Sequence, residues 1–558
     1  MTLKKLTLPE LLKTSCSKFA KKLSLNFVAS GKRTYQDLYN EVVAVAHHLL
    51  RLGVKKGDKV AILSANMPNW GITQFAIAQT GAITVPILPG FSSTELQNIL
   101  EHAEVKVIFV SRLLAKQLET VSTPFLKHKI LINNFATIPD GCYTPEELDR
   151  LTPDINLHDT SLLPSVEVEE DDIASIIYTS GTTGFSKGVI LTHKNLVWDA
   201  QQCHTIQPVD ETYKFLSILP MAHTYENTLG LLLPLMYGAQ VYYLDRVPTP
   251  KLLVPAMQKV RPTVILSVPL IIEKIYKTQV VPKFQKNKFI RTLYGFSPAR
   301  KILNYLAGKK LMQTFGGELK FFGIGGSKLD ATVERFLREA RFPYAIGYGL
   351  TETAPMVAGS NPSQTFLQGV GPVMEGVTIK INEPDHKGEG EIWIKGPNVM
   401  QGYYKRPELN EEVFSPDGWF KTGDLGAMDK QGRLSIRGRI KTMILGASGE
   451  NIYPEEIESI INNFRFVNES LVVEKKGKLV AMVHFNMEEL EKQYHKLKNQ
   501  AGNYKAKISD YIEEQKQELR EYVNARVNNF SKLQLVLVQH EPFEKTPTHK
   551  IKRFLYSK

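Results

Sequence analysis

Cysteine is scarce in this chain of 558 residues, which contains only Cys16, Cys142 and Cys203. These three residues lie far apart and form no C-x-x-C pair, so the sequence indicates neither a disulfide framework nor a zinc site. So few cysteines are typical of a protein from a reducing compartment, and we expect a cytoplasmic location.

Long hydrophobic runs are also missing. The N-terminal stretch MTLKKLTLPELLKTSCSKFAKK carries scattered charges and no apolar core, which argues against a secretory signal. The longest uncharged stretch, residues 227–244, is interrupted by Gly230, Pro234, Gly238 and Gln240 and is too broken for a membrane span. We expect a buried helix followed by a strand there.

Acidic residues are the minority, with 57 Asp and Glu against 69 Lys and Arg, and the formal net charge is +12. Such a charge favours anionic ligands and anionic surfaces, and it is compatible with loose contact between the protein and anionic lipid. We expect the basic residues to form solvated faces of mixed-sign helices such as residues 488–526. Nucleic acid is therefore not an expected partner.

The remaining composition and patterning predict an α/β protein of two domains. Apolar strands alternate with helical patterns from Gly57 onward, which predicts largely parallel sheets. After Gly371, short alternating strands with turns at 385–388 and 429–432 predict a small β-rich subdomain. We expect a large N-terminal domain of stacked α/β subdomains plus that subdomain (residues 1–438), followed by a small, mobile α+β domain (residues 439–558).

The stretch YTSGTTGFSKG, residues 178–188, combines hydroxyls, glycines and Lys187 between two predicted buried strands. Glycines let backbone N–H groups converge, and hydroxyls and a lysine add donors, so the loop is suited to hold phosphate oxygens. It is neither a Walker loop nor a Rossmann fingerprint, because Gly188 follows the lysine, a strand comes next, and no G-x-G-x-x-G opens a helix. The alternative is a polar hairpin turn.

Three further motifs have both a chemical and a structural interpretation. In GYGLTET (347–353), Glu352 could bind Mg²⁺ beside a polyphosphate or belong to a capped strand end. In GWFKTGDLG (418–426), Asp424 is predicted in a tight glycine-flanked turn, where it could accept two ribose hydroxyls or be structural. Lys550, in KTPTHKIKR (545–553), matters chemically only if the small domain folds back over the phosphate loop.

These motifs, together with G-R-x-K at 438–441, occur in an order that resembles the adenylate-forming (AMP-binding) superfamily of acyl-CoA synthetases, peptide adenylation domains and luciferases. The resemblance covers essentially the whole chain. Within the superfamily, LPMAHTYE (219–226) and RPTVILSVPLIIEKIY (261–276) look most like long-chain fatty-acyl-CoA synthetases. Asn227 and Leu270 depart from the pattern, since both stand where that group has arginine.

The resemblance implies an AMP-forming acid–thiol ligase that uses ATP and Mg²⁺. A fatty acid would become an acyl-AMP with release of pyrophosphate, and the acyl group would pass to coenzyme A or, alternatively, to acyl carrier protein. A nucleotide-binding protein without activity remains another class. Thr179 and Glu352 would hold the metal, His223 would contact the substrate, Lys441 would be the hinge, and Lys550 would contact carboxylate and α-phosphate.

The same resemblance implies a set of ATP-binding residues. They are Thr179, Ser180, Gly181, Thr182, Thr183, Gly184, Lys187, Gly326, Ser327, Gly347, Tyr348, Gly349, Thr351, Asp424 and Arg439.

Overall fold

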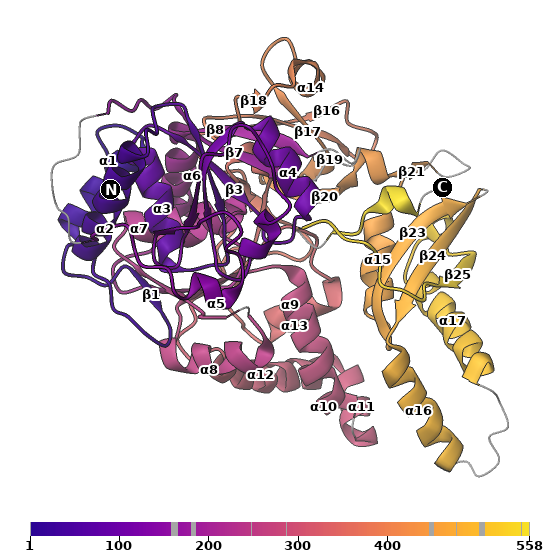
Figure 1. The fold of residues 1–558 in the computed structure, drawn as a ribbon. Coiled ribbons are helices and arrows are strands. Elements are labelled where there is room, and N and C mark those ends of the chain that lie inside the picture. Colours follow the sequence, from indigo (N-terminus) through magenta and orange to yellow (C-terminus); the bar gives the residue numbers. More distant parts are fainter. Residues whose placement is uncertain are drawn as a thin grey trace.

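A computed structural model describes residues 2–157, 166–179, 186–246, 248–285, 287–445, 451–475, 477–500, 508–547 and 550–556. Figure 1 shows a large lobe built around two extended sheets and a small C-terminal lobe beside it. No helix in these ranges is both long enough and apolar enough to cross a bilayer.

The first sheet of the large lobe has eight strands in the order β18-β8-β7-β3-β2-β4-β5-β6. Its central strands are parallel and buried on both faces, as expected where helices cover a sheet on both sides. The strands are β2 (Lys59–Leu63), β3 (Ile83–Ile87), β4 (Val105–Val110), β5 (His128–Leu131), β6 (Ala136–Thr137), β7 (Ile173–Thr179), β8 (Lys187–Thr192) and β18 (Gly402–Tyr403). The accompanying helices are α1 (Leu8–Lys18), α2 (Tyr35–Arg51), α3 (Pro68–Gln79), α4 (Ser93–His102), α5 (Pro145–Leu148) and α6 (His193–Ile206).

The second sheet has seven strands in the order β1-β10-β9-β11-β12-β13-β14 and is parallel except at β14. The strands are β1 (Leu25–Phe27), β9 (Lys214–Ser217), β10 (Gln240–Tyr243), β11 (Val264–Ser267), β12 (Phe321–Ile324), β13 (Tyr344–Gly349) and β14 (Met356–Gly359). The helices are α7 (Leu233–Met236), α8 (Pro250–Val260), α9 (Pro269–Ile275), α10 (Val281–Gln285), α11 (Lys288–Gly295), α12 (Ser297–Thr314) and α13 (Ala331–Glu339). The predicted helix-then-strand at 227–244 is confirmed as a π-helix (Glu226–Leu232) continued by α7 and β10.

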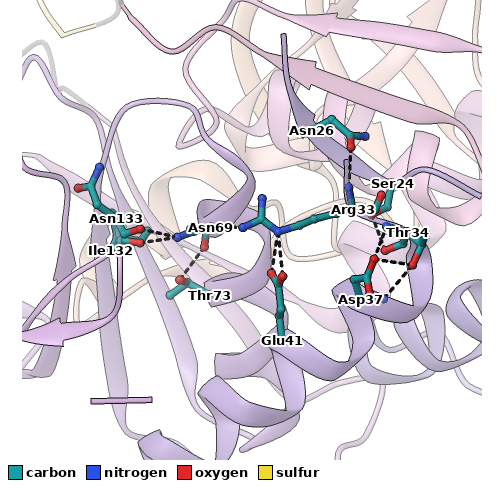
Figure 2. A network of polar contacts seen from close by, with 10 residues as sticks. All are labelled: Ser24, Asn26, Arg33, Thr34, Asp37, Glu41, Asn69, Thr73, Ile132 and Asn133. Atoms are coloured by element: carbon teal, nitrogen blue, oxygen red, sulfur yellow. Dashed lines mark hydrogen bonds and ion pairs between the residues drawn. The ribbon is translucent and has the colours of Figure 1, made fainter. Parts of the chain in front are cut away.

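A polar network ties the two sheets together near the N-terminus (Figure 2). Arg33, in the segment after β1, pairs with Glu41 of α2 at 2.8 Å and donates to Asn69 of α3 at 3.3 Å. Asn69 in turn donates to the carbonyl of Ile132, just beyond β5. Because β1 belongs to the seven-stranded sheet and β5 to the eight-stranded one, this network fixes one sheet against the other.

Residues 371–439 form the β-rich subdomain, an antiparallel sheet in the order β15-β20-β19-β17-β16. Both predicted turns are present, since the N–H of Gly388 bonds to the carbonyl of Asp385 and that of Gly432 to the carbonyl of Asp429. The elements are β15 (Gly371–Pro372), β16 (Thr378–Asn382), β17 (Gly390–Lys395), α14 (Pro407–Val413), β19 (Phe420–Met428) and β20 (Arg433–Arg439).

The small lobe has its own hydrophobic core, in which Phe464, Val483, Phe485 and Leu519 are buried. Its elements are β21 (Ile444–Leu445), β22 (Asn451–Ile452), α15 (Pro454–Asn462), β23 (Val467–Lys475), β24 (Lys478–Phe485), α16 (Met487–Gln500), α17 (Ile508–Asn524) and β25 (Leu535–Val538). The α/β large lobe, the β-rich subdomain and the α+β small lobe confirm the predicted fold class.

Candidate active site

The phosphate-loop motif connects two antiparallel strands, as its flanks predict. Thr179 at the end of β7 is paired with Lys187 at the start of β8. The predicted ligands Ser180, Gly181, Thr182, Thr183 and Gly184 lie outside the described residues. The hairpin therefore places one hydroxyl and one ammonium group at the same end of the sheet.

Lys187, Glu352 and Tyr403 form a cluster beside this hairpin. The Tyr403 hydroxyl donates to Glu352 Oε1 at 2.9 Å, and Lys187 Nζ lies 4.9 Å from the centre of the Tyr403 ring. Tyr403 reaches this position because β18 pairs with β8. Burial, followed by the charge of Lys441, lowers the pKa of Lys187, while Glu352 acts in the opposite direction. This part of the site therefore contains the carboxylate of Glu352 and the ammonium groups of Lys187 and Lys441.

Asp424 lies between Tyr348 and Arg439. The Tyr348 hydroxyl donates to Asp424 Oδ2 at 2.8 Å, and Arg439 Nε lies 3.0 Å from Oδ1. Burial, followed by the charge of Asp424, raises the pKa of Tyr348, so its hydroxyl remains a donor. The carboxylate is buried, whereas the arginine is half exposed.

The prediction that Asp424 lies in a tight turn is wrong. Asp424 is part of β19, directly opposite Arg439 of β20. The register between β17 and β19 shifts at this point, and Gly423 has a φ of +70°. A glycine in the left-handed region accommodates such a bulge, which reorients the following side chain without ending the strand.

Adjacent residues of β13 face different parts of the site, because successive side chains in a strand alternate between its two faces. Tyr348 reaches Asp424, whereas Gly347 lines an apolar cavity. At Gly349 an added Cβ would lie 1.7 Å from the carbonyl oxygen of Pro355, so only glycine fits there. Thr351 follows in a short 3-10 helix, Thr351–Thr353, that also carries Glu352.

Gly326 and Ser327 lie beyond the end of β12. Gly326 has a φ of +88°, a conformation that favours glycine, and Ser327 is exposed. An added Cβ at Gly326 would find only Val268 within 4 Å, at 3.8 Å, so the backbone here borders open space.

His223 lies in the segment between β9 and the π-helix, with its Nδ1 accepting a hydrogen bond from the backbone N–H of Tyr225 at 3.2 Å. Burial, followed by the charge of Lys550, lowers the pKa of His223 to about 4. The neutral ring therefore carries its proton on Nε2, which leaves an N–H donor for a ligand.

Lys550 is brought to the same place by the C-terminal tail. Residues 545 and 551 are paired, and the N–H of Thr546 bonds to the carbonyl of Lys550, so a hairpin presents the lysine. Burial, followed by the charge of Arg439, lowers the pKa of Lys550, while the carboxylates of Asp424 and Glu352 raise it. The residue as a whole is exposed, although its ammonium group is directed into the site.

The tail hairpin is seated against Gly90, in the segment after β3. An added Cβ at Gly90 would lie 3.2 Å from Pro547 Cα and 3.4 Å from Pro547 Cβ. The absence of a side chain at residue 90 therefore allows the hairpin to approach the large lobe closely.

Lys441 lies in a 3-10 turn, Ile440–Thr442, directly after β20 and just before the small lobe. Several polar contacts join the lobes around this turn. Tyr453 donates to Glu389 at 3.1 Å, Lys328 pairs with Glu456 at 2.6 Å, and Lys277 donates to the carbonyl of Val467 at 2.6 Å. These contacts fix the orientation in which Lys550 reaches the site.

The apolar cavity beside Gly347 has a volume of about 40 Å³. Its lining includes Cys203, Tyr225, Leu229, Leu266 and Met356. An engineered cavity that binds benzene measures about 150 Å³. A long acyl chain would therefore displace some of these side chains on entering.

The polar groups present fit a nucleotide triphosphate. Lys187, Arg439 and Lys550 supply positive charge, the buried Asp424 supplies an acceptor for hydroxyls, and Gly326 leaves open space at its backbone. No cluster of three or more metal-ligating His, Cys, Asp or Glu side chains occurs among the described residues. A single carboxylate such as Glu352 is nevertheless compatible with Mg²⁺, which is commonly held by one or two carboxylates plus phosphate oxygens and water.

Two residues of this site were not foreseen from the sequence, Tyr403 and Gly90. Tyr403 enters through a two-residue strand whose partner lies more than two hundred positions earlier in the chain. Gly90 matters only through its contact with the distant tail. Neither stands in a stretch with a local chemical signal.

Comparisons with known proteins agree with this geometry. A family model described as AMP-binding enzyme matches residues 12–404. The long-chain-fatty-acid–CoA ligase FadD15 of Mycobacterium bovis is 31% identical over 467 residues, covering 79% of this chain and 75% of the relative. The chloroplastic long-chain-fatty-acid–[acyl-carrier-protein] ligase AEE15 of Arabidopsis thaliana is 29% identical over 542 residues, covering 83% and 73%.

The fold is also that of solved structures. An ATP-bound crystal structure of the RpMatB-BxBclM chimera B1 superimposes with a TM-score of 0.77 at 22% identity, covering 99% of this chain and 98% of that chain. At this identity the comparison supports the architecture of both lobes.

Proposed function

Because the chain belongs to the AMP-binding enzyme family, we propose that it activates a long-chain fatty acid with ATP and transfers the acyl group to coenzyme A. In the first step a carboxylate oxygen attacks the α-phosphorus of ATP, and the bond to pyrophosphate breaks, giving acyl-AMP. In the second step the thiol attacks the acyl carbonyl, loses its proton, and releases AMP. The long-chain-fatty-acid–CoA ligases among the relatives support this substrate class.

The observation that carries the proposal is the meeting of Lys550, Arg439, Asp424, Glu352 and His223 in one site. Two anions must approach each other for adenylation, and positive charge held in place lowers that repulsion without reorganisation during the reaction. Lys550 would neutralise carboxylate and α-phosphate together, and the Nε2–H of His223 would orient the acid.

Asp424 would accept the ribose hydroxyls; its contacts with Tyr348 and Arg439, which hold the carboxylate, support this role. Lys187 would bind the terminal phosphates. Thr179 and Glu352 would hold Mg²⁺, which supplies charge neutralisation on the triphosphate. The acyl chain would enter at the apolar cavity beside Gly347, whose apolar lining supports this role.

The two steps make opposite demands on Lys550, because a lysine over the α-phosphate obstructs the thiol. We therefore infer a swing of the small lobe at Lys441 between adenylation and thiolysis, with residues 439–558 moving as a unit.

All three cysteines are unpaired, which supports a reducing compartment such as the cytoplasm.

The test measures pyrophosphate exchange with a ladder of fatty acids in the absence of thiol. Exchange is expected with long chains, and its absence for every chain length would refute the acyl substrate. Lys550→Ala is expected to abolish exchange while largely sparing thiolysis of supplied acyl-AMP. Equal loss of both steps would contradict the role given to Lys550.

Acyl carrier protein is the second candidate acceptor, favoured by the similarity to AEE15. Its phosphopantetheine offers the same thiol, so the first step is unchanged. Steady-state rates with coenzyme A and with holo-carrier protein decide between them, and a preference of orders of magnitude for the carrier would overturn our choice.

A further inference from the structure

Residues 281–314 differ in charge from the rest of the chain. They contain eight basic residues and no aspartate or glutamate; the basic residues are Lys283, Lys286, Lys288, Arg291, Arg300, Lys301, Lys309 and Lys310. The expectation that basic residues form mixed-sign helices holds for α16 and α17 but is wrong for this segment, which forms α10, α11 and α12. In Figure 1 these helices lie at the lower margin of the large lobe.

Most of these cationic side chains form no salt bridge in the part of the chain that the structure describes. Arg300 pairs with Glu339 of α13 at 2.8 Å, and Lys309 lies 4.9 Å from the centre of the Tyr305 ring. Within the described ranges, no salt bridge is formed by the other cationic side chains, Lys283, Lys288, Arg291, Lys301, Lys309 and Lys310. The charge is therefore available to an external anion.

The helices α11 and α12, and Phe296 between them, also expose large apolar side chains. Phe289 is 69% exposed, Phe296 66%, Ile302 63% and Leu306 55%. None of the side chains of α11 is buried. Single exposed apolar residues are common, but four within eighteen positions of an acid-free segment form a distinct surface.

The surface is firmly attached to the large lobe. An added Cβ at Gly308 of α12 would lie 2.4 Å from the carbonyl oxygen of Ala340, so α12 packs tightly beside the end of α13. Leu311 of α12 is buried in the core beneath the seven-stranded sheet. The helix pair therefore keeps its place whatever the orientation of the small lobe.

We propose that the cationic hairpin, residues 288–314, docks the protein on the surface of an anionic lipid bilayer. Lysine and arginine side chains are attracted to anionic head groups, and exposed phenylalanine, isoleucine and leucine side chains enter the boundary between head groups and acyl chains. At the bilayer surface, acyl chains would contact the apolar side chains that are exposed in the free protein, namely Phe289, Phe296, Ile302 and Leu306.

Two other occupants fit less well. A second copy of the chain, docked by a two-fold axis, would bring the same cationic surface against itself, which is repulsive. Nucleic acid would neutralise the lysines, but interfaces with nucleic acid are strongly polar and would leave Ile302 and Leu306 without apolar contact. Anionic lipid satisfies both the charged and the apolar side chains.

The experiment is flotation of the full chain with vesicles of phosphatidylcholine alone and of phosphatidylcholine mixed with phosphatidylglycerol. Binding is expected only to the mixed vesicles and is expected to weaken as salt is added. The variant Lys288→Gln, Lys301→Gln, Lys309→Gln, Lys310→Gln is expected to lower partitioning by at least about a hundredfold, since each charge near the surface contributes roughly fivefold.

The matched control replaces four lysines that are exposed elsewhere, as Lys21→Gln, Lys32→Gln, Lys116→Gln, Lys430→Gln. It changes the net charge equally and is expected to retain most of the binding. The pair Phe289→Gln, Leu306→Gln is expected to weaken binding while leaving its salt dependence unchanged, since no charge is removed.

Equal binding by the two quadruple variants, or equal binding to both kinds of vesicle, would overturn the proposal. So would a dimer in sedimentation velocity that dissociates only in the hairpin variant, or tighter retention on RNA than on mixed vesicles. Circular dichroism and pyrophosphate exchange with free acid check that each variant is folded. Flotation requires no catalysis, so its failure is distinguishable from failure of the proposed function.

Discussion

Arg439 Nε lies 3.0 Å from Asp424 Oδ1, directly across the ladder between β19 and β20. The opposite oxygen of the same carboxylate accepts from Tyr348 at 2.8 Å. Only 6% of the Asp424 side chain is exposed, against 51% of Arg439, so the carboxylate is held from the core side while the guanidinium borders the open site. The Asp424 carboxylate is therefore held in one orientation before a ligand binds.

Replacing Asp424 with asparagine should weaken ATP binding more than replacing Tyr348 with phenylalanine. Asp424→Asn removes the charged acceptor, and hydrogen bonds to charged groups contribute about 1.5–3 kcal/mol. We expect KM for ATP in pyrophosphate exchange to rise roughly tenfold or more. Tyr348→Phe removes only an orienting bond and should raise KM a few-fold. A larger effect of Tyr348→Phe would contradict the assignment of Asp424 as the ligand.

A side chain at Gly90 should obstruct the hairpin that carries Lys550. The Cβ of Gly90→Ala would lie 3.2 Å from Pro547 Cα, and the larger side chain of Gly90→Val would displace the hairpin further. We expect a graded loss of adenylation, small for alanine and about tenfold or more for valine, because small misplacements of a catalytic group are costly. Thiolysis of supplied acyl-AMP should be unchanged.

The control for this series is Gly295→Val, because an added Cβ at Gly295 meets nothing within 4 Å. It should leave both steps intact. Parallel loss of adenylation and thiolysis in Gly90→Val would indicate general damage to the large lobe and contradict a role in seating the tail.

The site residues that the sequence predicted all lie in short stretches with a distinctive composition. Lys187, Glu352, Asp424 and Lys550 stand among glycines, hydroxyls or prolines, which signal special backbone geometry. The alternation of apolar strands and helices likewise predicted the parallel sheets. The error at Asp424 has a physical reason, because a glycine with positive φ is compatible with both a turn and a bulge, and the cross-strand partner decides between them.

The sequence did not predict features that depend on contacts between distant parts of the chain. Asn227, which departs from the family arginine, makes a reciprocal pair of hydrogen bonds with Gln74 of α3, at 2.9 and 3.1 Å. This buried pair satisfies both amides, so the departure is accommodated by a partner 153 positions away. Leu270, the other departure, is 60% exposed at the start of α9. No local pattern predicts either environment.

Glu226 should make the stability of the protein depend on pH. It is fully enclosed, accepts from the Ser217 hydroxyl at 2.5 Å, and has no partner for its other oxygen among the described residues. Burial raises the pKa of Glu226 to about 8 from 4.5. Between these two values the Glu226 carboxyl binds more protons in the folded state than in the unfolded state, so its contribution to the free energy of unfolding is most favourable below pH 4.5 and falls as pH rises to 8.

Glu226→Gln mimics the neutral acid and should remove this dependence. Relative to the parent chain, its Tm should be similar near the lower pKa value and higher near the upper one. The space around the Glu226 side chain is tight, since an added Cβ at Gly230 would lie 2.7 Å from Glu226 Cδ. Glutamine has nearly the same size as glutamate and therefore fits there. Glu146→Gln, at an exposed site, is the control. A shift in Tm that is the same at both pH values would contradict this account.

Lys277 should stabilise the orientation in which the lobes meet for adenylation. Its Nζ donates to the carbonyl of Asn462, the last residue of α15, at 3.2 Å and to that of Val467, the first residue of β23, at 2.6 Å. The C-terminal end of a helix favours a cation. Lys277→Met removes both bonds and should lower the rate of pyrophosphate exchange by about tenfold, because fewer molecules hold Lys550 in place. Thiolysis of supplied acyl-AMP should be unchanged or faster.

Lys274→Met is the matched control, since this lysine lies three positions earlier, is exposed, and donates no side-chain bond to the small lobe within the described residues. The lobe orientation can be followed directly by energy transfer between dyes, one on each lobe, and Lys277→Met should shift it away from the closed state whereas Lys274→Met should not. If Lys277→Met lowers the rate of pyrophosphate exchange without changing energy transfer, Lys277 acts within the large lobe. Its contacts with the small lobe would then not select between adenylation and thiolysis.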